Sequence, residues 1–356
     1  MRIPVLNIYH MLAYSWRSLE QAEKVRIDHA DRLDLLNLLA SVLTGTVRRL
    51  VKRGLNGNYV LSTDEINGVK GKFEVGPTVK TLAHRKLRAI CTFDEFSQDI
   101  LLNRMIVSVL IRLLNTEGLD KEIRSKVRSL IWHFPGIRDC DIEIKDFNRL
   151  RLGKNERHYR FVISLCKLIA GQLLPSEKAG EYHFDDFTRD ENKMNRLFES
   201  FVRNFYSCKL GNEWSVGSEI IEWKLRPFSE DAKAFLPVMQ TDITIRNHRK
   251  KVIIDTKYYQ KTLTEYYGSE KIRSGHLYQL LSYLNNQEKT HDPITLSAAG
   301  ILLYPRVEES LDLSYNYQSH DLHIKTVDLS QDWRKVETEL MLIWNSVLNN
   351  SFTNSK

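Results

Sequence analysis

The sequence predicts a protein of the α/β (α+β) class, with a largely helical N-terminal part and a C-terminal mixed sheet flanked by helices. Three observations predict this class. Apolar residues recur at helical spacing through most of the first half, around a small β element. The second half alternates helical stripes with β-branched runs that polar turns interrupt. The length of 356 residues corresponds to about two domains.

The first half contains several segments whose apolar residues lie on one stripe of a helix. The expected helices cover residues 31–53, 99–114, 119–134 and 159–174. Residues 1–16 mix Pro4 with aromatic and aliphatic residues, which predicts a short strand and a first helical turn. Asn67-Gly68 divides residues 59–75, and this stretch predicts two short strands.

The polar run PSEKAG at residues 175–180 has Pro at one end and Gly at the other, as linkers often do. We therefore expect an N-terminal domain at residues 1–175 and a C-terminal domain at residues 181–356. The expected strands of the second domain cover residues 182–187, 238–246, 251–258, 298–304 and 323–329, and its expected helices cover residues 190–206, 276–286 and 333–347.

Charge gives a mild indication of a polyanionic partner such as nucleic acid. The net charge is +7 and the sequence pI is about 9.0. Basic residues gather at residues 48–53 and again at residues 78–89. Each of these runs is either a solvated face or a contact with DNA or with a protein partner.

Several classes of function are excluded by missing patterns. The four cysteines form no CxxC pair, so neither a zinc site nor a disulfide framework is implied. No secretion signal and no apolar run of about 18 residues are present, so we expect a cytoplasmic protein without a membrane span. The sequence lacks GxxxxGK[ST], so the chain is not expected to hydrolyse nucleotides itself.

The most informative stretch is a hairpin of two β-branched strands around the polar turn Asn247–Lys250. With His248 and Arg249 at the centre of the turn, antiparallel pairing follows directly. It sets Ile245 opposite Val252, Ile243 opposite Ile254 and Asp242 opposite Asp255. The apolar pairs share one face, as a register selected by burial requires. Asp242, Asp255 and Lys257 then share the other face.

Two carboxylates on opposed strands repel each other unless a proton or a cation lies between them. A hard divalent cation such as Mg²⁺ prefers carboxylate and water oxygens. Lys257 follows Asp255 by two residues, so its ammonium would reach the same place. It would orient an attacking water or stabilise charge on a phosphate. The alternative is an exposed Asp pair with a Lys ion pair.

These residues, Asp242 and Asp255-Thr256-Lys257, resemble the PD-(D/E)xK nuclease motif. Gln279 and Tyr283 resemble the Q-x-x-x-Y motif of RecB-like nucleases. The chain as a whole resembles the McrC family, the nuclease subunits of McrBC modification-dependent restriction systems. The stretches that carry this resemblance are NIYHMLAYSW, CTFDEFSQDILLNR, HYRFVISLCK, TDITIR, IIDTKYY and LYQLLSYL. Thr241 replaces the Pro of the motif, and Asp255 stands where Glu is common.

The resemblance implies a Mg²⁺-dependent (or Mn²⁺-dependent) DNA endonuclease. Asp242, Asp255 and the backbone carbonyl of Thr256 would hold the metal. Lys257 would position or activate a water. Glu199, on the helix before the sheet, would add a further metal ligand, as similar nucleases place an acidic residue there. Glu199 could equally be solvated or paired with a basic residue.

Four further residues are expected beside Lys257 or near DNA. Gln279 would orient Lys257 or a DNA phosphate, and Tyr283 lies four residues later on the same helix face. The alternative is that Tyr283 packs in the core while Gln279 caps a backbone group. Lys271 and Arg273 lie in a loop that interleaves basic and aromatic residues, which suits a DNA strand.

The resemblance also implies a partner, an McrB-like AAA+ ring that binds and hydrolyses GTP. The N-terminal domain would dock to this ring and stimulate its GTPase. The substrate would be double-stranded DNA with modified bases of the 5-methylcytosine type. Two alternatives stay open: a regulatory GTPase-stimulating adaptor, and a standalone RecB-like repair nuclease.

Overall fold

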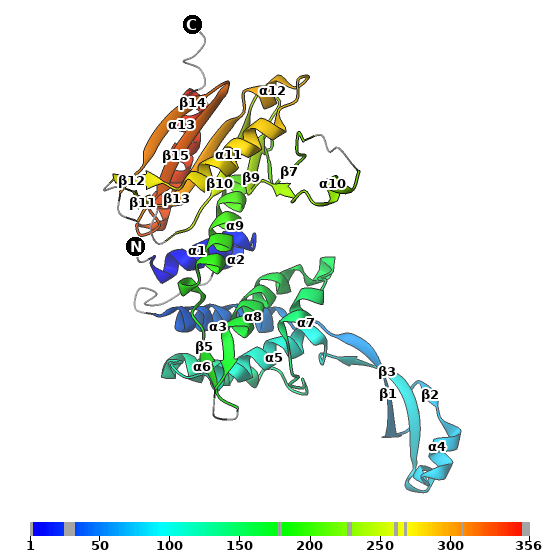
Figure 1. Cartoon of the computed structure of the whole chain (residues 1–356). Coiled ribbons are helices and arrows are strands. Elements are labelled where there is room, and N and C mark those ends of the chain that lie inside the picture. The colour runs from blue at the N-terminus through cyan, green and yellow to red at the C-terminus, as the bar shows by residue number, and fades with distance from the viewer. Residues whose placement is uncertain are drawn as a thin grey trace. The chain divides into compact units, whose positions relative to one another are not determined.

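The computed structural model describes residues 3–24, 33–176, 178, 180–225, 230–259, 263–266, 269–307 and 309–350 (Figure 1). The chain forms two compact units. The sheet unit combines the residues up to Lys24 with those from Asp186 onward, and the helical unit spans Asp34–Asp185. No helix within the described ranges is long and apolar enough to cross a membrane.

Four amphipathic helices form the body of the helical unit: α3 (Leu35–Arg53), α5 (Leu101–Leu114), α6 (Lys121–Ile131) and α8 (Arg160–Gln172). Helices α3 and α5 each pack against both α6 and α8, through the apolar stripes that predicted them. The Asp34 side chain caps α3 by accepting a hydrogen bond from the backbone N–H of Asn37. The remaining elements of this body are α7 (Ile144–Arg149), η3 (Lys154–Tyr159), β4 (Leu173–Pro175) and β5 (Tyr182–Phe184).

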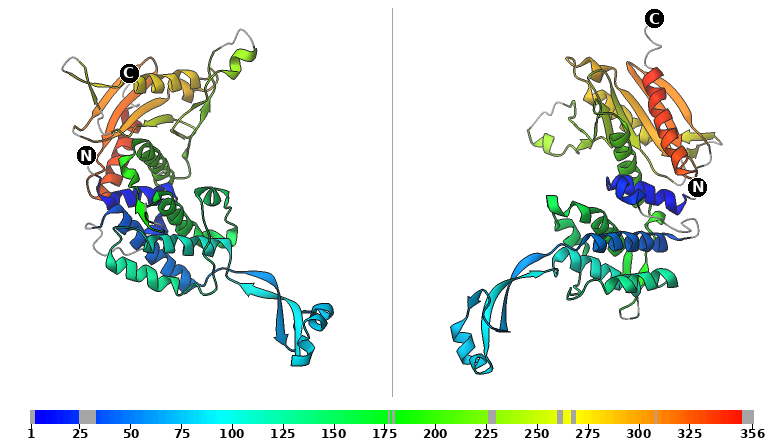
Figure 2. Two further views of the ribbon diagram at one scale, coloured as in Figure 1. Left: turned by 60° about the horizontal axis from the view of Figure 1, so that its bottom comes forward. Right: turned by 180° about the vertical axis from the view of Figure 1, so that it is seen from behind.

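A long β-hairpin projects from the four helices of its own unit (Figures 1 and 2). Strands β1 (Asn58–Asn67) and β3 (Arg88–Ser97) pair antiparallel along their whole length. Their connection contains β2 (Lys72–Phe73), α4 (Val75–Lys80) and η2 (Ala83–Lys86). Most side chains of β1 are exposed. The two strands that the sequence predicted at residues 59–75 are β1 and β2, which are divided at Asn67-Gly68. Both pair with β3, which begins only at the end of the basic run.

The sheet unit is built on a six-stranded mixed sheet with the order β14-β15-β13-β10-β9-β6. Strand β10 runs parallel to β13, and β13 runs parallel to β15, whereas the other neighbours are antiparallel. This confirms the predicted mixed sheet. The strands are β6 (Ser215–Gly217), β9 (Ile243–Arg246), β10 (Lys251–Thr256), β13 (Ala299–Pro305), β14 (Asp312–Tyr317) and β15 (His320–Val327).

Helices α11 (Ser274–Gln287) and α13 (Trp333–Asn350) cover opposite faces of this sheet, as the front view of Figure 1 and the rear view of Figure 2 show together. Helix α9 (Glu191–Lys209) contacts β6 and β10. The smaller elements are α2 (Leu19–Glu23), η4 (Phe187–Arg189), β7 (Ile220–Ile221), α10 (Glu230–Ala234), β8 (Met239–Gln240), β11 (Leu263–Tyr266), β12 (Ser269–Ile272) and α12 (Pro293–Leu296).

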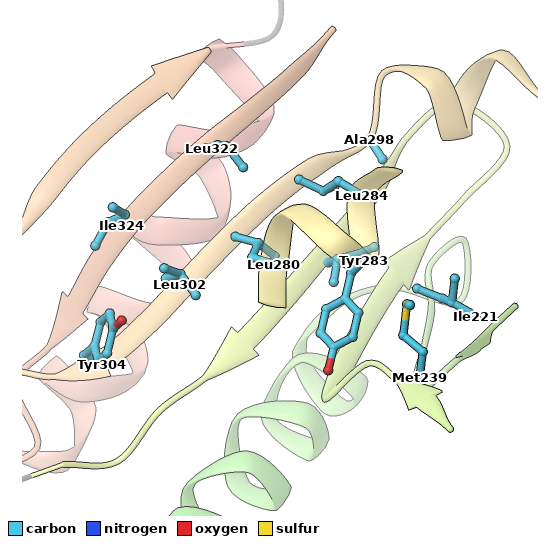
Figure 3. Close-up of a cluster of buried hydrophobic side chains, with 11 residues drawn as sticks. Ile221, Met239, Leu280, Tyr283, Leu284, Ala298, Leu302, Tyr304, Leu322 and Ile324 are labelled. Carbon is cyan, nitrogen blue, oxygen red and sulfur yellow. The ribbon is translucent and has the colours of Figure 1, made fainter. Parts of the chain in front are cut away.

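A hydrophobic cluster fixes α11 against the sheet (Figure 3). Leu280 and Leu284 of α11 lie over β13, whereas Tyr283 points toward Met239 of β8 and Ile221 of β7 (Figure 3). Gly300 on β13 makes this approach possible, because a Cβ there would lie 3.0 Å from side-chain carbons of both leucines. The close packing of α11 on β13 therefore depends on glycine, which has no side chain, at position 300.

The chain opens with a helix, α1 (Val5–Ser15), where the sequence predicted a short strand and one helical turn. Helix α1 packs on α9 and so belongs to the sheet unit. Asn7 donates side-chain hydrogen bonds to the backbone carbonyls of Leu329 and Gln331, both at 2.8 Å. The compact units thus differ from the predicted sequence ranges, although the C-terminal division, between Asp185 and Asp186, lies close to the expected linker.

Candidate active site

The hairpin of β9 and β10 has the register that the sequence predicted. Ile245 pairs with Val252, and Ile243 pairs with Ile254. The turn closes with a hydrogen bond of 3.0 Å from the Asn247 backbone N–H to the Lys250 carbonyl. The regular pairing ends at Ile243, so Asp242 lies just before β9, next to the end of β10.

Asp242 is fixed against the end of β10 by backbone and side-chain contacts. Its Oδ2 accepts hydrogen bonds from the backbone N–H of Thr256 at 2.9 Å and from the Thr256 hydroxyl at 3.1 Å. Its backbone carbonyl accepts a hydrogen bond of 3.1 Å from the Arg203 guanidinium of α9. The other carboxylate oxygen, Oδ1, makes no hydrogen bond within the described residues.

Asp255 is fully buried in β10. Its Oδ1 accepts a hydrogen bond of 2.9 Å from the Lys257 ammonium, whereas Oδ2 has no partner in the described part of the chain. Burial, and then the charge of Asp242, raise the pKa of Asp255 to about 7, and Lys257 opposes this rise. A buried carboxylate oxygen without a partner is costly, so this site favours a proton or a cation.

Glu199 of α9 lies within electrostatic range of the pair. Burial and the nearby charge of Asp242 raise the pKa of Glu199. Its Oε1 accepts a hydrogen bond of 3.1 Å from Arg203, four residues later on the same helix. No three acidic, His or Cys side chains of the described residues are arranged as a ready metal-binding group. Glu199 is therefore near the two aspartates but engaged with Arg203.

The donor set of the two aspartates nevertheless fits a hard divalent cation. Asp255 Oδ2 is buried without a partner, and Asp242 Oδ1 is not used in the hydrogen bonds of its carboxylate. Both are carboxylate oxygens, which Mg²⁺ and Mn²⁺ prefer. The backbone carbonyl of Thr256, between Asp255 and Lys257, offers a neutral oxygen, which hard divalent cations also accept.

Lys257 extends from the end of β10 and is held by the neighbouring strand. Its backbone N–H donates to the Leu303 carbonyl of β13 at 3.0 Å. The next residue, Tyr258, donates its backbone N–H to the Asn195 side chain of α9 at 2.8 Å. The lysine side chain is mostly buried and points to Asp255. Two elements thus fix the backbone on either side of the ammonium group.

Gln279 and Tyr283 form a hydrogen-bonded pair on α11. Gln279 Nε2 donates to the Tyr283 hydroxyl at 2.7 Å, and that hydroxyl donates to the backbone carbonyl of Gln240 at 2.8 Å. Burial raises the pKa of Tyr283 to about 12. Tyr283 packs in the hydrophobic cluster, as one of the two sequence interpretations had it (Figure 3). Gln279 contacts Tyr283, and no contact between Gln279 and Lys257 is found among the described residues.

Of the two basic residues expected near DNA, the structure describes the side chain of Arg273 but not that of Lys271. The side chain of Lys271 lies outside the described residues, although its backbone belongs to β12. Arg273 immediately precedes α11, and its guanidinium carbon lies 4.5 Å from the centre of the Tyr259 ring. Its Nε atom is buried and has no hydrogen-bond partner in the described part of the chain.

Sequence reasoning missed several residues of this site. Arg203 contacts both Glu199 and Asp242, and the spacing of four residues from Glu199 was the available signal. Asn195 was not detectable, because its contact with Tyr258 depends on how α9 packs. His276 lies three residues before Gln279 on α11, and this helical spacing could have drawn attention to it.

The fold and the site define an α/β protein with a candidate hydrolytic centre of two aspartates and one lysine at the ends of neighbouring strands. Residues 7–305 match the model of the family described as McrBC 5-methylcytosine restriction system component. The chain is 35% identical over 346 residues to a protein of Escherichia coli K12 named Type IV methyl-directed restriction enzyme EcoKMcrBC. That similarity covers 97% of this chain and 98% of the relative. The chain belongs to this McrBC family.

A solved structure supports the fold. The chain resembles one chain of a half-complex from a tetradecameric assembly of Thermococcus gammatolerans McrB AAA+ hexamers with bound McrC. The TM-score is 0.63 and the sequence identity is 17%, and the similarity covers 97% of this chain and 76% of the other. At this identity the similarity establishes a common fold.

Proposed function

We propose that this chain is the DNA endonuclease subunit of a GTP-dependent, modification-directed restriction complex. The single observation that carries the proposal is the buried Asp255. It has one unpartnered oxygen and lies beside Asp242 and Lys257 at the end of β10. A structural ion pair would satisfy both oxygens of a carboxylate buried this deeply. A site that binds a cation for catalysis leaves an oxygen free.

Asp242 and Asp255 hold the divalent cation in this proposal, with the carbonyl of Thr256 as a third oxygen. A bound Mg²⁺ or Mn²⁺ lowers the pKa of water and offsets negative charge on a phosphate. The Thr256 N–H and hydroxyl orient Asp242 through its Oδ2. Glu199 becomes available as an additional metal ligand when its ion pair with Arg203 breaks.

Besides the metal ion, the proposed site contains a positive charge from the chain itself, the ammonium group of Lys257. Its contact with Asp255 keeps the ammonium beside the carboxylate pair. From this place it orients a water for attack and stabilises the charge that develops on a phosphodiester. Hydrolysis at one site leaves a nick, so cutting both strands requires two sites or two visits.

The helical unit is the part we propose to dock to the GTPase partner. Its projecting hairpin exposes several large apolar side chains. They include Tyr59, Leu61, Leu87 and Phe96, and exposed apolar groups of this size are typical of protein interfaces. The partner, an McrB-like AAA+ ring, binds the GTP and recognises modified cytosine in double-stranded DNA.

The test uses the chain purified together with an McrB-like AAA+ protein from the same organism. Cleavage of methylated and unmethylated plasmid is compared with GTP and Mg²⁺ present or omitted, and Asp255→Asn serves as the inactive control. We expect cleavage of the methylated plasmid only, and only when both additions are present. Stimulated GTP hydrolysis without cleavage would identify an adaptor. Cleavage without partner or GTP would identify a standalone nuclease.

A further inference from the structure

Beyond Lys257, a group of aromatic and basic side chains surrounds the start of α11. The pairing of β10 with β13 places the first of these side chains. Thr256 pairs with Leu303 in the parallel register, so Tyr304 on β13 lies beside Lys257. Tyr304 accordingly points to the face that α11 covers, where it belongs to the hydrophobic cluster (Figure 3). His276, in the first turn of α11, meets Tyr304 on this face.

His276 is held on two sides. Its Nδ1 lies 2.9 Å from the Tyr304 hydroxyl, and its ring stacks on Tyr259 with 5.1 Å between ring centres. Only 8% of the residue is exposed, and Tyr304 is fully buried. Burial, together with the charges of Lys257 and Arg273, lowers the pKa of His276 to about 4. The imidazole is therefore neutral at neutral pH.

The buried hydroxyl of Tyr304 determines which nitrogen of His276 carries the proton. Among the described residues this hydroxyl has one hydrogen-bond partner, Nδ1 of His276. A buried hydroxyl hydrogen needs an acceptor, so Tyr304 donates to Nδ1. The proton of the neutral ring then lies on Nε2. Within the described residues the ring of His276 forms its hydrogen bond through Nδ1, so Nε2 is left for a ligand. The Nε of Arg273 is buried and has no partner in the described part of the chain.

Two donors thus lie at the N-terminus of α11, where the helix dipole also favours negative charge. We propose that Nε2 of His276 and the Arg273 guanidinium bind a backbone phosphate of the DNA beside the phosphate that Lys257 serves. Tyr304 is a positioning residue that fixes the tautomer of His276, and Tyr259 supports both donors from one ring. This inference rests on the proposed nuclease function and names how that site holds its substrate.

Two amide substitutions of His276 separate phosphate binding from a structural role. The amide nitrogen of Gln lies near the position of Nε2, whereas the amide of Asn lies near the position of Nδ1. A phosphate contact therefore predicts that His276→Gln keeps function and that His276→Asn loses it. A purely structural role through Tyr304 predicts the opposite order.

The first measurement is the affinity of the full-length chain for a short fluorescein-labelled DNA duplex, in EDTA at fixed low salt. We expect His276→Asn to weaken binding about tenfold, as for the loss of one hydrogen bond to a charged group. Tyr304→Phe should weaken it by less than His276→Asn, because the proton is then shared between Nδ1 and Nε2 and part of the protein still presents the Nε2–H donor. His276→Gln should stay within about threefold of the wild type.

A second duplex series carries one uncharged methylphosphonate in place of a phosphate, moved along the strand. At the bound position the wild type should lose affinity, while His276→Asn should lose little more. The matched control is His323→Asn on β15: His323 is also buried and its Nδ1 also meets a hydroxyl, that of Ser314. Its pairing with Ile301 places it on the opposite face of the sheet from Tyr304, so it should not change DNA affinity.

Wild-type affinity of His276→Asn, or better function of His276→Asn than of His276→Gln, would overturn the inference. The proposed nuclease function fails in a different way, through absence of cleavage by the wild-type complex with partner, GTP and Mg²⁺. In that event the affinities in EDTA still decide whether His276 contacts a phosphate, because they require neither cleavage nor metal.

Discussion

At the scale of single residues, Asp255 shows most clearly how burial changes the protonation of a group in the proposed site. Its pKa in the folded chain is about 7, above its ordinary value of 3.8. Between these values the metal-free folded protein holds a proton that the unfolded chain releases. The contribution of this group to the free energy of unfolding is therefore fully present below about pH 4 and is lost as pH rises through about 7.

Asp255→Asn removes this charge, so it should stabilise the metal-free protein at about pH 8 and change little at about pH 4. The gain is at most about 4 kcal/mol, at roughly 1.36 kcal/mol per pKa unit. The measurement is denaturant unfolding in EDTA at both pH values, with the exposed Glu309→Gln as control. Equal effects of Asp255→Asn at the two pH values would contradict the raised pKa.

Substitutions of Lys257 distinguish a role in catalysis from a role in electrostatic attraction of DNA. A compact ammonium beside the carboxylate pair is not matched by a planar guanidinium, whose donors point elsewhere. Lys257→Arg and Lys257→Ala should both lose at least about 10²-fold in cleavage rate, as for a removed charge-stabilising group. Stimulated GTP hydrolysis should change little. The rate is measured at saturating partner and Mg²⁺, and near-normal cutting by Lys257→Arg would reduce Lys257 to a phosphate clamp.

The register of the aspartates was predictable because β-branched residues alternate around a short polar turn, and alternation fixes the face of every side chain. The partners of those aspartates were not predictable. Arg203 reaches the backbone of Asp242 only because α9 packs beside β10. The pairing of His276 with Tyr304 likewise needs the parallel register of β10 and β13. Helical spacing could have drawn attention to Arg203 and His276, but it does not reveal that they contact Asp242 and Tyr304.

Among the elements, α11 carries His276, Gln279 and Tyr283, and its packing on β13 depends on Gly300. A methyl group at this position would press on Leu280 and Leu284, which are themselves buried. Gly300→Ala should destabilise the protein by about 1–3 kcal/mol, the usual range for overpacking. It should also reduce cleavage, because the start of α11 moves. Gly217→Ala on β6, where an added Cβ meets nothing within 4 Å, is the control.

Thermal unfolding and cleavage rate are measured on both glycine variants. A Gly300→Ala protein as stable and as active as Gly217→Ala would show that α11 adjusts without cost.

Helix α1 shows why one element was misread. It has no side-chain cap at its start, and residues on several of its sides are buried. The sequence therefore offered neither the usual start signal nor a polar face. By contrast, α3 begins with a capping aspartate and has a clear stripe, and it was predicted within a few residues of its true ends. Packing on α9, which the sequence does not reveal, determines α1.

Over the whole molecule, the two units predict which fragments fold. A fragment from residue 181 onward lacks α1, so it exposes the surface of α9 that α1 covers and the carbonyls that Asn7 satisfies. We expect this fragment to be less stable than the intact chain, by several kcal/mol for the lost burial of a whole helix. The fragment 34–185 contains a complete unit and should fold.

The measurement is circular dichroism and thermal unfolding of both fragments. Addition of a synthetic peptide with the sequence of residues 1–24 should raise the melting temperature of the first fragment and leave that of the second unchanged. A fragment from residue 181 that is as stable alone as with the peptide would show that α1 is dispensable to the sheet unit.

The contact of α1 with the segment around Leu329 also determines the order in which parts of the chain fold during synthesis. Helix α1 is made before α9 and before the segment around Leu329, both of which it contacts. At about 5–20 residues per second, α1 waits for tens of seconds before its last partners emerge. The helical unit needs nothing beyond Asp185 and can fold in that interval. The sheet that carries Asp255 and Lys257 is thereby complete only after β15 is made, and a translation product truncated before β15 should lack the assembled site.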